Sequence, residues 1–96
     1  MERLYETIFV LKPDLEEEVR DRLLDRVRNI ILDNDGDLVD VDIWGKRKLA
    51  YEINDYRTGF YTVILFKGNV NTINELERNY KIIDAVLRHL IIRKEN

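Results

Sequence analysis

Residues 4–11 read LYETIFVL, and this stretch decides how the rest of the chain has to be arranged. Side chains alternate between the two faces of a β-strand, so the stretch divides into two sets. One set is Tyr5, Thr7, Phe9 and Leu11, and the other is Leu4, Glu6, Ile8 and Val10. Because both sets are mostly apolar, the pattern predicts a central strand that is covered on both faces. Pro13 lacks a backbone N–H, so we expect the strand to end before it.

A helix is predicted after this strand. Asp14 followed by Glu17 matches a capping box, the side-chain pattern that satisfies free backbone N–H groups at a helix start. Apolar residues then recur at helical spacing and form the expected buried stripe, which comprises Leu15, Val19, Leu23, Leu24, Val27, Ile30 and Ile31. Asn34 and Gly36 end the helix, because both residue types suit the turn that follows one.

The remainder of the chain reads as strand, loop, strand, helix and strand. The strands are predicted at residues 38–53, 60–66 and 86–92, with a loop at 54–59 and a helix after 68–71. Gly45 marks an expected bend or bulge within the second strand.

The order βαββαβ predicts an α+β, ferredoxin-like sandwich. Right-handed crossovers place the first and third strands at the centre of a four-stranded antiparallel sheet, with two helices on one face. Apolar residues on the other face are then left uncovered, and we expect them to form a binding surface. They are Ile8, Val10, Tyr61, Val63 and Leu65. The alternative is that they are ordinary scattered surface residues.

Length and composition limit the possibilities further. The 96 residues suit a single domain spanning residues 1–96, and the formal net charge is −3. The chain has no cysteine, so it has no disulfide framework or thiolate metal site. The first residues do not resemble a signal peptide, and no apolar run approaches the ~20 residues that span a bilayer, so we expect a cytoplasmic protein.

The sequence offers little for catalysis, and we predict that the protein is not an enzyme and uses no cofactor or metal. The only histidine, His89, lies in an apolar strand, where a packed or edge role is the usual one. Residues 33–37 read DNDGD but fail the calcium-loop spacing and are predicted to be a turn. The acylphosphatase anion loop is absent at residues 11–15, and residues 58–65 lack most aromatic positions of an RNA recognition motif.

Residues 45–54 read GKRKLAYEIN and carry the strongest functional signal. Three adjacent cations on an acidic chain indicate a local anionic partner rather than general attraction to polyanions. Lys46, Arg47 and Lys48 are all able to contact phosphate oxygens, and Arg47 can do so with two parallel hydrogen bonds. The alternative is that these cations only keep a strand edge soluble and unpaired.

This segment resembles the bacterial small-subunit ribosomal protein S6 family, in which a glycine and basic residues precede a Leu-Ala-Tyr-x-Ile strand. The same pattern stands here at residues 45–53. Tyr5-Glu6, Pro13, Gly59-Phe60 and Asp84-Ala85-Val86 followed by Arg88 match in order, so the similarity runs from about residue 5 to residue 94.

The resemblance implies a structural, non-catalytic role in the small ribosomal subunit. It implies a heterodimer with small-subunit ribosomal protein S18, which binds the central domain of the small-subunit ribosomal RNA during assembly. By similarity, the candidates for RNA binding are Arg3, Tyr5, Lys46, Arg47, Lys48 and Arg88. The candidates for the protein-partner interface are Trp44, Leu49, Tyr51 and Phe60.

A different function class stays open at this point. A ferredoxin-like regulatory module that binds a small metabolite at a dimer interface would also have an open sheet face. That alternative leaves Lys46, Arg47 and Lys48 without a role.

Overall fold

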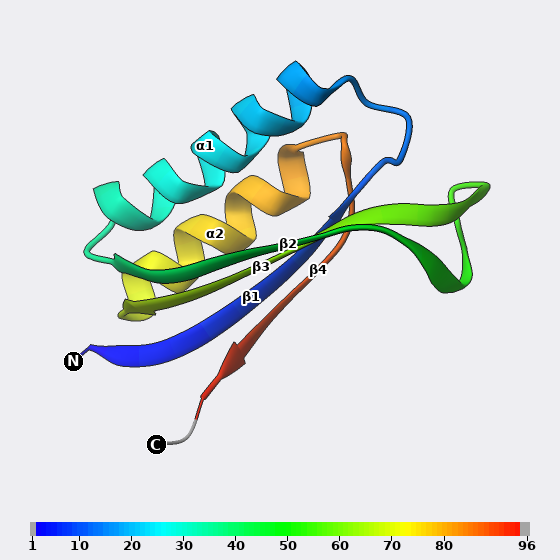
Figure 1. Ribbon diagram of the computed structural model, residues 1–96. Helices are drawn as coiled ribbons and strands as arrows, with labels where there is room; N and C mark the ends of the chain where they lie inside the picture. The colour runs from blue at the N-terminus through cyan, green and yellow to red at the C-terminus, as the bar shows by residue number, and fades with distance from the viewer. Residues whose placement is uncertain (1, 95–96) are drawn as a thin grey trace.

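The computed structural model describes residues 2–94 and contains the six predicted elements in the predicted order. They are β1 (Arg3–Leu11), α1 (Glu17–Asp33), β2 (Asp37–Ile53), β3 (Tyr56–Gly68), α2 (Val70–Ile82) and β4 (Val86–Arg93). The sheet has the order β2-β3-β1-β4 and all its pairings are antiparallel. Figure 1 shows both helices on the same side of the sheet. The predicted ferredoxin-like α+β fold is therefore confirmed, with β1 and β3 at the centre.

The core forms between the helices and the alternate residues of β1 that the sequence predicted. Phe9 and Leu11 are almost completely buried, and Thr7 lies between Ile64 of β3 and Ile91 of β4 in the register. The helices and the central strands supply the remaining buried members of this core, which are Val27, Ile31, Ile64, Phe66, Leu76 and Tyr80. Burial of this apolar layer is the main source of stability for the sandwich.

The helix starts differ from the prediction. α1 begins at Glu17 with Glu16 as its N-cap, and no side chain caps it, so the predicted Asp14–Glu17 capping box is wrong. Pro13 and Asp14 lie instead in a turn that leads the chain away from β1. The capping box is found at α2, where the Asn69 side chain accepts hydrogen bonds from the backbone N–H groups of Asn71 and Thr72.

The β2–β3 hairpin is longer and tighter than predicted. Its turn consists of Asn54 and Asp55, both with positive φ (49° and 70°), so the predicted loop at 54–59 mostly belongs to β3. Asn and Asp tolerate this left-handed conformation better than other non-glycine residues. The predicted bulge at Gly45 is confirmed by its φ of 82° and by a shift in strand register.

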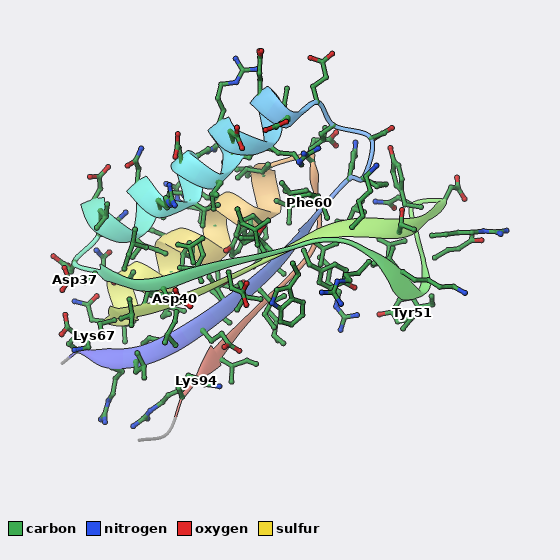
Figure 2. The ribbon with its side chains drawn as sticks, viewed as in Figure 1. Asp37, Asp40, Tyr51, Phe60, Lys67 and Lys94 are labelled. Carbon is green, nitrogen blue, oxygen red and sulfur yellow. The ribbon has the colours of Figure 1, made fainter. Side chains whose placement is uncertain are left out.

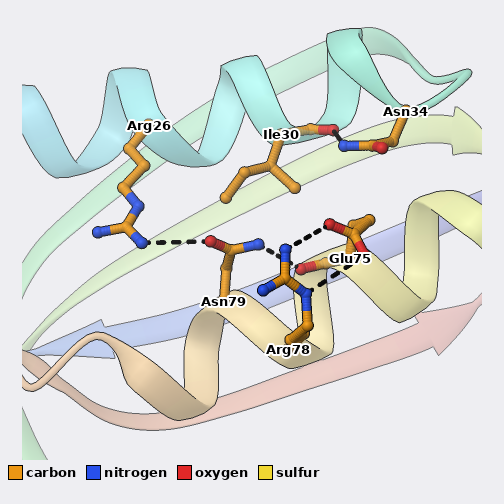
Figure 3. A network of polar contacts seen from close by, with 6 residues as sticks. All are labelled: Arg26, Ile30, Asn34, Glu75, Arg78 and Asn79. Carbon is orange, nitrogen blue, oxygen red and sulfur yellow. Dashed lines mark hydrogen bonds and ion pairs between the residues drawn. The ribbon is translucent and has the colours of Figure 1, made fainter.

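A polar network joins the two helices on the side away from the sheet (Figure 3). Arg26 of α1 donates to the side-chain oxygen of Asn79 of α2 at 3.2 Å, and the Asn79 amide donates to the Glu75 carbonyl at 2.8 Å. Arg78 lies beside the Glu75 carboxylate at 2.8 Å and lowers the pKa of that group by hydrogen bonding. These contacts are exposed, so they orient the helices more than they stabilise the fold.

No helix within residues 2–94 is long and apolar enough to span a membrane.

One buried polar chain links β1, α2 and β4. Thr7 is fully buried, its hydroxyl oxygen lies 2.9 Å from the Tyr80 phenol oxygen, and it donates to the Leu90 carbonyl at 3.1 Å. In this arrangement the Tyr80 O–H donates to Thr7. Burial raises the pKa of the Tyr80 phenol well above its usual range, so the phenol stays protonated and needs an acceptor.

Replacing Thr7 with valine should therefore destabilise the fold by about 1–3 kcal/mol, because the buried phenol of Tyr80 is left without its acceptor. Urea denaturation of the Thr7→Val variant measures this effect. The double variant Thr7→Val, Tyr80→Phe should recover most of the stability, since both polar partners are then removed. The control is Thr58→Val at an exposed β3 position, which should change stability by less than about 0.5 kcal/mol. Equal stability of the single and double variants would show that the hydrogen bond is unimportant.

Candidate functional site

The outer halves of β2 and β3 form a hairpin that extends past the helices, at the right of Figure 1. We call this hairpin, residues 44–61, the arm. Leu49 of this arm is only 7% exposed, because it lies with Val10 against Gly59. A Cβ at Gly59 would lie 2.2 Å from a methyl carbon of Val10, so only glycine permits this approach. The arm thus packs on the sheet face that the helices leave open.

This packing corrects one expectation from the sequence. Val10 and Val63 are 2% and 8% exposed, so they do not belong to the uncovered face that was predicted. Ile8, Tyr61 and Leu65 are only half-buried, as an open face requires. On β4 of the same face, Leu90 is 47% and Ile92 is 40% exposed. Next to them is a hollow of about 180 Å³ lined by Ile8, Val10, Tyr61, Arg88, His89 and Leu90.

Two arginines lie over two aromatic rings at the arm. The Arg47 guanidinium carbon is 5.7 Å from the Trp44 ring centre, and that of Arg88 is 5.9 Å from the Tyr51 ring centre. Arg88 also donates to the Tyr51 phenol oxygen at 3.3 Å. Trp44 stacks on Tyr61 with ring centres 6.2 Å apart and an 18° angle between the planes. We call Trp44, Arg47, Tyr51, Tyr61 and Arg88 the cation–aromatic surface.

This geometry mixes two groups of residues that the sequence kept apart. Arg47 and Arg88 were candidates for RNA, whereas Trp44 and Tyr51 were candidates for a protein partner. In the structure each arginine lies over one of those rings. Tyr61 connects the two pairs, because it stacks on Trp44 and lines the same hollow as Arg88. Tyr61 was not among the ten candidates, but the alternation of β3 had placed it on the uncovered sheet face that was expected to form a binding surface.

Arg57 of the arm pairs with the Glu52 carboxylate at 3.0 Å, but four other cations of this region lack a carboxylate partner within residues 2–94. Lys46 and Lys48 are exposed on either side of Arg47 along β2, and none of these three or Arg88 takes part in an ion pair within residues 2–94. Lys12 differs, because its ammonium lies 2.8 Å from the Asp84 carboxylate, which raises the pKa of Lys12 by hydrogen bonding. The positive charge at the arm is therefore accessible to an external anion.

Arg3 and Tyr5 lie at the opposite end of the sheet. Arg3 lies opposite Gly68 in the strand register, while Arg88 lies opposite Val10, roughly 23 Å farther along β1 at ~3.3 Å per residue. Arg3 and Arg88 are therefore far apart, although both were RNA-binding candidates and stand on the neighbouring strands β1 and β4. Arg93 does adjoin Arg3, and both line a hollow of about 520 Å³ together with Tyr5, Asn69, Val70 and Asn71.

Phe60 lies on the helix side of the sheet. Its ring is half-buried, 4.3 Å below the Arg20 guanidinium, and it lines a cleft of about 190 Å³ together with Phe9 and Ile43. Figure 2 labels Phe60 beside the helix layer and Tyr51 on the arm. Of the four residues that the sequence assigned to a protein partner, Trp44 and Tyr51 are exposed on the arm, Leu49 is buried and Phe60 faces the helices.

The structure also shows where the residues that were considered for catalysis or metal binding lie. His89 packs on the Tyr80 ring with centres 4.9 Å apart, and its Nε2 lies 3.0 Å from a Glu77 carboxylate oxygen, so it is a packed residue as predicted. Asp35 lies in the turn between α1 and β2 with a φ of 67°. Within residues 2–94, no group of three or more His, Cys, Asp or Glu side chains is arranged to hold a metal ion.

These features define a class of protein: a small ferredoxin-like domain with an exposed surface of cations and aromatic rings. Comparison with known proteins specifies the class. The family model "Ribosomal protein S6" matches residues 4–93. The small ribosomal subunit protein bS6 of Alkaliphilus oremlandii is 50% identical over 91 residues, covering 95% of this chain and 96% of the relative.

Two further relatives agree. The bS6 protein of Thermoanaerobacter pseudethanolicus is 48% identical and covers 97% of this chain and 98% of its own length. The crystal structure of 30S ribosomal protein S6 from Thermotoga maritima superposes with a TM-score of 0.92 at 37% identity, covering 98% of this chain and 89% of that one.

The chain therefore belongs to the ribosomal protein S6 family, as its sequence motifs indicated. It is a structural protein of the small ribosomal subunit and not an enzyme. The metabolite-binding regulatory module considered from the sequence is set aside on this basis.

The position of the arm should depend on Leu49. Replacing it with alanine leaves a cavity between the arm and Val10, so we expect the stability to fall by about 2 kcal/mol and amide hydrogen exchange in the arm to become faster. Urea denaturation and residue-resolved hydrogen exchange measure the two effects. Ile82→Ala, at a residue that is 62% exposed on α2, is the control and should leave arm exchange unchanged. Unchanged exchange in Leu49→Ala would show that the arm is held in another way.

Proposed function

We propose that this protein binds the central domain of the small-subunit ribosomal RNA as a heterodimer with small-subunit ribosomal protein S18. The observation that carries the proposal is the group of four exposed cations at the arm, Lys46, Arg47, Lys48 and Arg88, which form no ion pair within residues 2–94. Phosphate oxygens are the ligands that suit such a group, and arginine binds them with two parallel hydrogen bonds.

The overall charge supports the need for a second protein. With a net charge of −3, the chain as a whole repels a polyanion, so the attraction has to come from local groups of cations such as those at the arm. Phosphate contacts by so few cations give weak, salt-sensitive binding. A partner that brings its own positive charge and docks beside the arm would supply the remaining attraction.

The exposed apolar side chains of β4 support a docking position for that partner. Leu90 lines the hollow beside Arg88, and Ile92 follows it on the same face of β4. A protein bound there would lie next to the proposed RNA contacts. Phe60, with its cleft under α1, offers a second apolar contact on the helix side of the sheet. Leu49 contributes indirectly, by holding the arm in place.

Arg3 and Tyr5 form a separate proposed RNA contact. Because they lie roughly 23 Å from Arg88 along β1, at ~3.3 Å per residue, they would reach a different stretch of the RNA backbone. Arg93 lines the same hollow as Arg3 and adds a second positive charge there.

Reversing the charges of the arm should abolish assembly without unfolding the protein. The variant Lys46→Glu, Arg47→Glu, Lys48→Glu should no longer bind a complex of S18 and a central-domain RNA fragment, as measured by gel shift. Its melting temperature should change little, because the three side chains are exposed. The matched control is Arg22→Glu, Arg26→Glu, Lys81→Glu, which makes the same charge change on the helices. If binding is abolished equally in both triple variants, the effect is one of net charge and the arm has no specific role.

Binding should also be cooperative. We expect the protein alone to bind the RNA fragment weakly, and the addition of S18 to tighten binding at least tenfold, because charge and surface are then shared. Titrations at several salt concentrations measure both affinity and salt dependence. Replacing any one of Lys46, Arg47 and Lys48 removes one phosphate-binding cation, so the slope of log K against log salt should become shallower by roughly 0.7–0.9. An affinity that S18 leaves unchanged would contradict the heterodimer.

A further inference from the structure

We infer that Trp44 and Tyr51 stack on unpaired nucleobases of the RNA, while Arg47 and Arg88 bind the adjoining phosphates. This inference rests on the proposed RNA binding and names the part of the RNA that the cation–aromatic surface recognises. The ligand is a single-stranded nucleotide whose base is turned out of its helix.

Trp44 is fixed as a platform. Its ring is 43% exposed and stacks on Tyr61, and its indole N–H donates to a carboxylate oxygen of Asp42 at 3.0 Å. These two contacts hold the orientation of the ring before any ligand arrives. A ring held in this way binds a base with little loss of conformational freedom.

Tyr51 repeats this arrangement on the arm. Its ring is 62% exposed, which is unusually open for an aromatic side chain on a strand, and Arg88 contacts both the ring and the phenol oxygen. In both pairs a guanidinium lies within 6 Å of a ring centre. Such an arginine can turn toward a phosphate and leave the ring to a base, since bases and guanidinium groups stack on the same aromatic surface.

The surroundings favour a nucleotide over a protein at these two rings. Arg47 lies over the Trp44 ring and Arg88 lies over the Tyr51 ring, so each ring has an arginine next to it. Lys46 and Lys48 precede and follow Arg47 on β2, with their side chains on the other face of the strand. The centres of protein–protein interfaces are depleted in lysine and other charged residues. Aromatic rings interspersed with lysine and arginine are instead typical of proteins that bind single-stranded nucleic acid.

Acidic residues on β2 set the direction in which the RNA backbone would run. Asp40 and Asp42 lie opposite Leu65 and Val63 of β3, on the open face of the sheet. Their carboxylates repel phosphates from that part of the face. A base on Trp44 therefore has its phosphate directed toward the tip of the arm, where Arg47 lies.

The chain contains a single tryptophan, so stacking on Trp44 can be observed directly. The probes are a mixed-sequence single-stranded RNA oligonucleotide and inorganic polyphosphate, each added to the full chain at low salt. The oligonucleotide should quench the Trp44 fluorescence by a large fraction, and polyphosphate, which has no bases, should not. Equal effects of the two probes would show that the surface binds phosphate alone and would overturn the inference.

Variants separate stacking from protein contact. With S18 present, Trp44→Leu and Tyr51→Leu should each weaken binding of the central-domain RNA fragment about 5- to 100-fold, the range of effects typical for removal of a stacking ring. Trp44→Phe and Tyr51→Phe should stay within about threefold of the unmodified protein, because an aromatic ring remains. The control is Leu32→Ala, at a residue that is 50% exposed on α1 and distant from the arm in sequence.

The affinity for S18 without RNA is measured on the same variants. Unchanged S18 affinity together with weakened RNA binding supports stacking. If S18 affinity falls in the leucine variants instead, the two rings belong to the protein interface and the inference is wrong. If the unmodified protein binds RNA but the leucine variants bind it equally well, the inference alone fails. If the unmodified protein binds no RNA even with S18, the proposed function fails with it.

Discussion

The constraint on which the structure depends is that β1 has to be covered on both of its faces. The two helices cover one face and bury Phe9 and Leu11. On the other face, the arm folds back because Gly59 has no side chain, which lets Leu49 and Val10 meet beside it. This second cover is incomplete, and the exposed surface that remains is where the arginines and aromatic rings gather. The requirement for a covered central strand thus also positions the candidate functional surface.

The fold could be predicted because its determinants are local and repeated. Alternation in β1, helical spacing in α1 and the order of the elements leave few topologies that a short chain can adopt. The predictions that were wrong, the cap of α1 and the length of the hairpin turn, concern places where neighbouring residues favour different local structures. Asp14 has the right chemistry for a cap, but Pro13 draws it into a turn and the helix starts later. The two-residue turn at Asn54 and Asp55 was predicted as a longer loop, because its length is set by the register between β2 and β3 rather than by the residue types in it.

The functional surface was predictable only in part. The basic segment and its aromatic neighbours stand out along the sequence, and family resemblance assigned them to RNA or protein. Which side chains contact one another depends on the tertiary structure. Arg88 and Tyr51, for example, are 37 positions apart in the sequence, yet they share a hydrogen bond. The same long-range geometry separates Arg3 from Arg88, although both are basic residues on neighbouring strands. Sequence identifies the members of such a surface, whereas their grouping follows from strand register.

The position of β2 in the sheet has one more consequence. β2 is an edge strand, so the backbone N–H and C=O groups along one of its sides pair with no other strand within residues 2–94. A second copy of the chain could otherwise pair with this edge and extend the sheet. Asp37, Asp40 and Asp42 are spaced along its first half, and the bulge at Gly45 interrupts its regular pattern. Two copies approaching margin to margin in antiparallel fashion would set these carboxylates against one another. These three carboxylates therefore oppose the pairing of two copies along this edge.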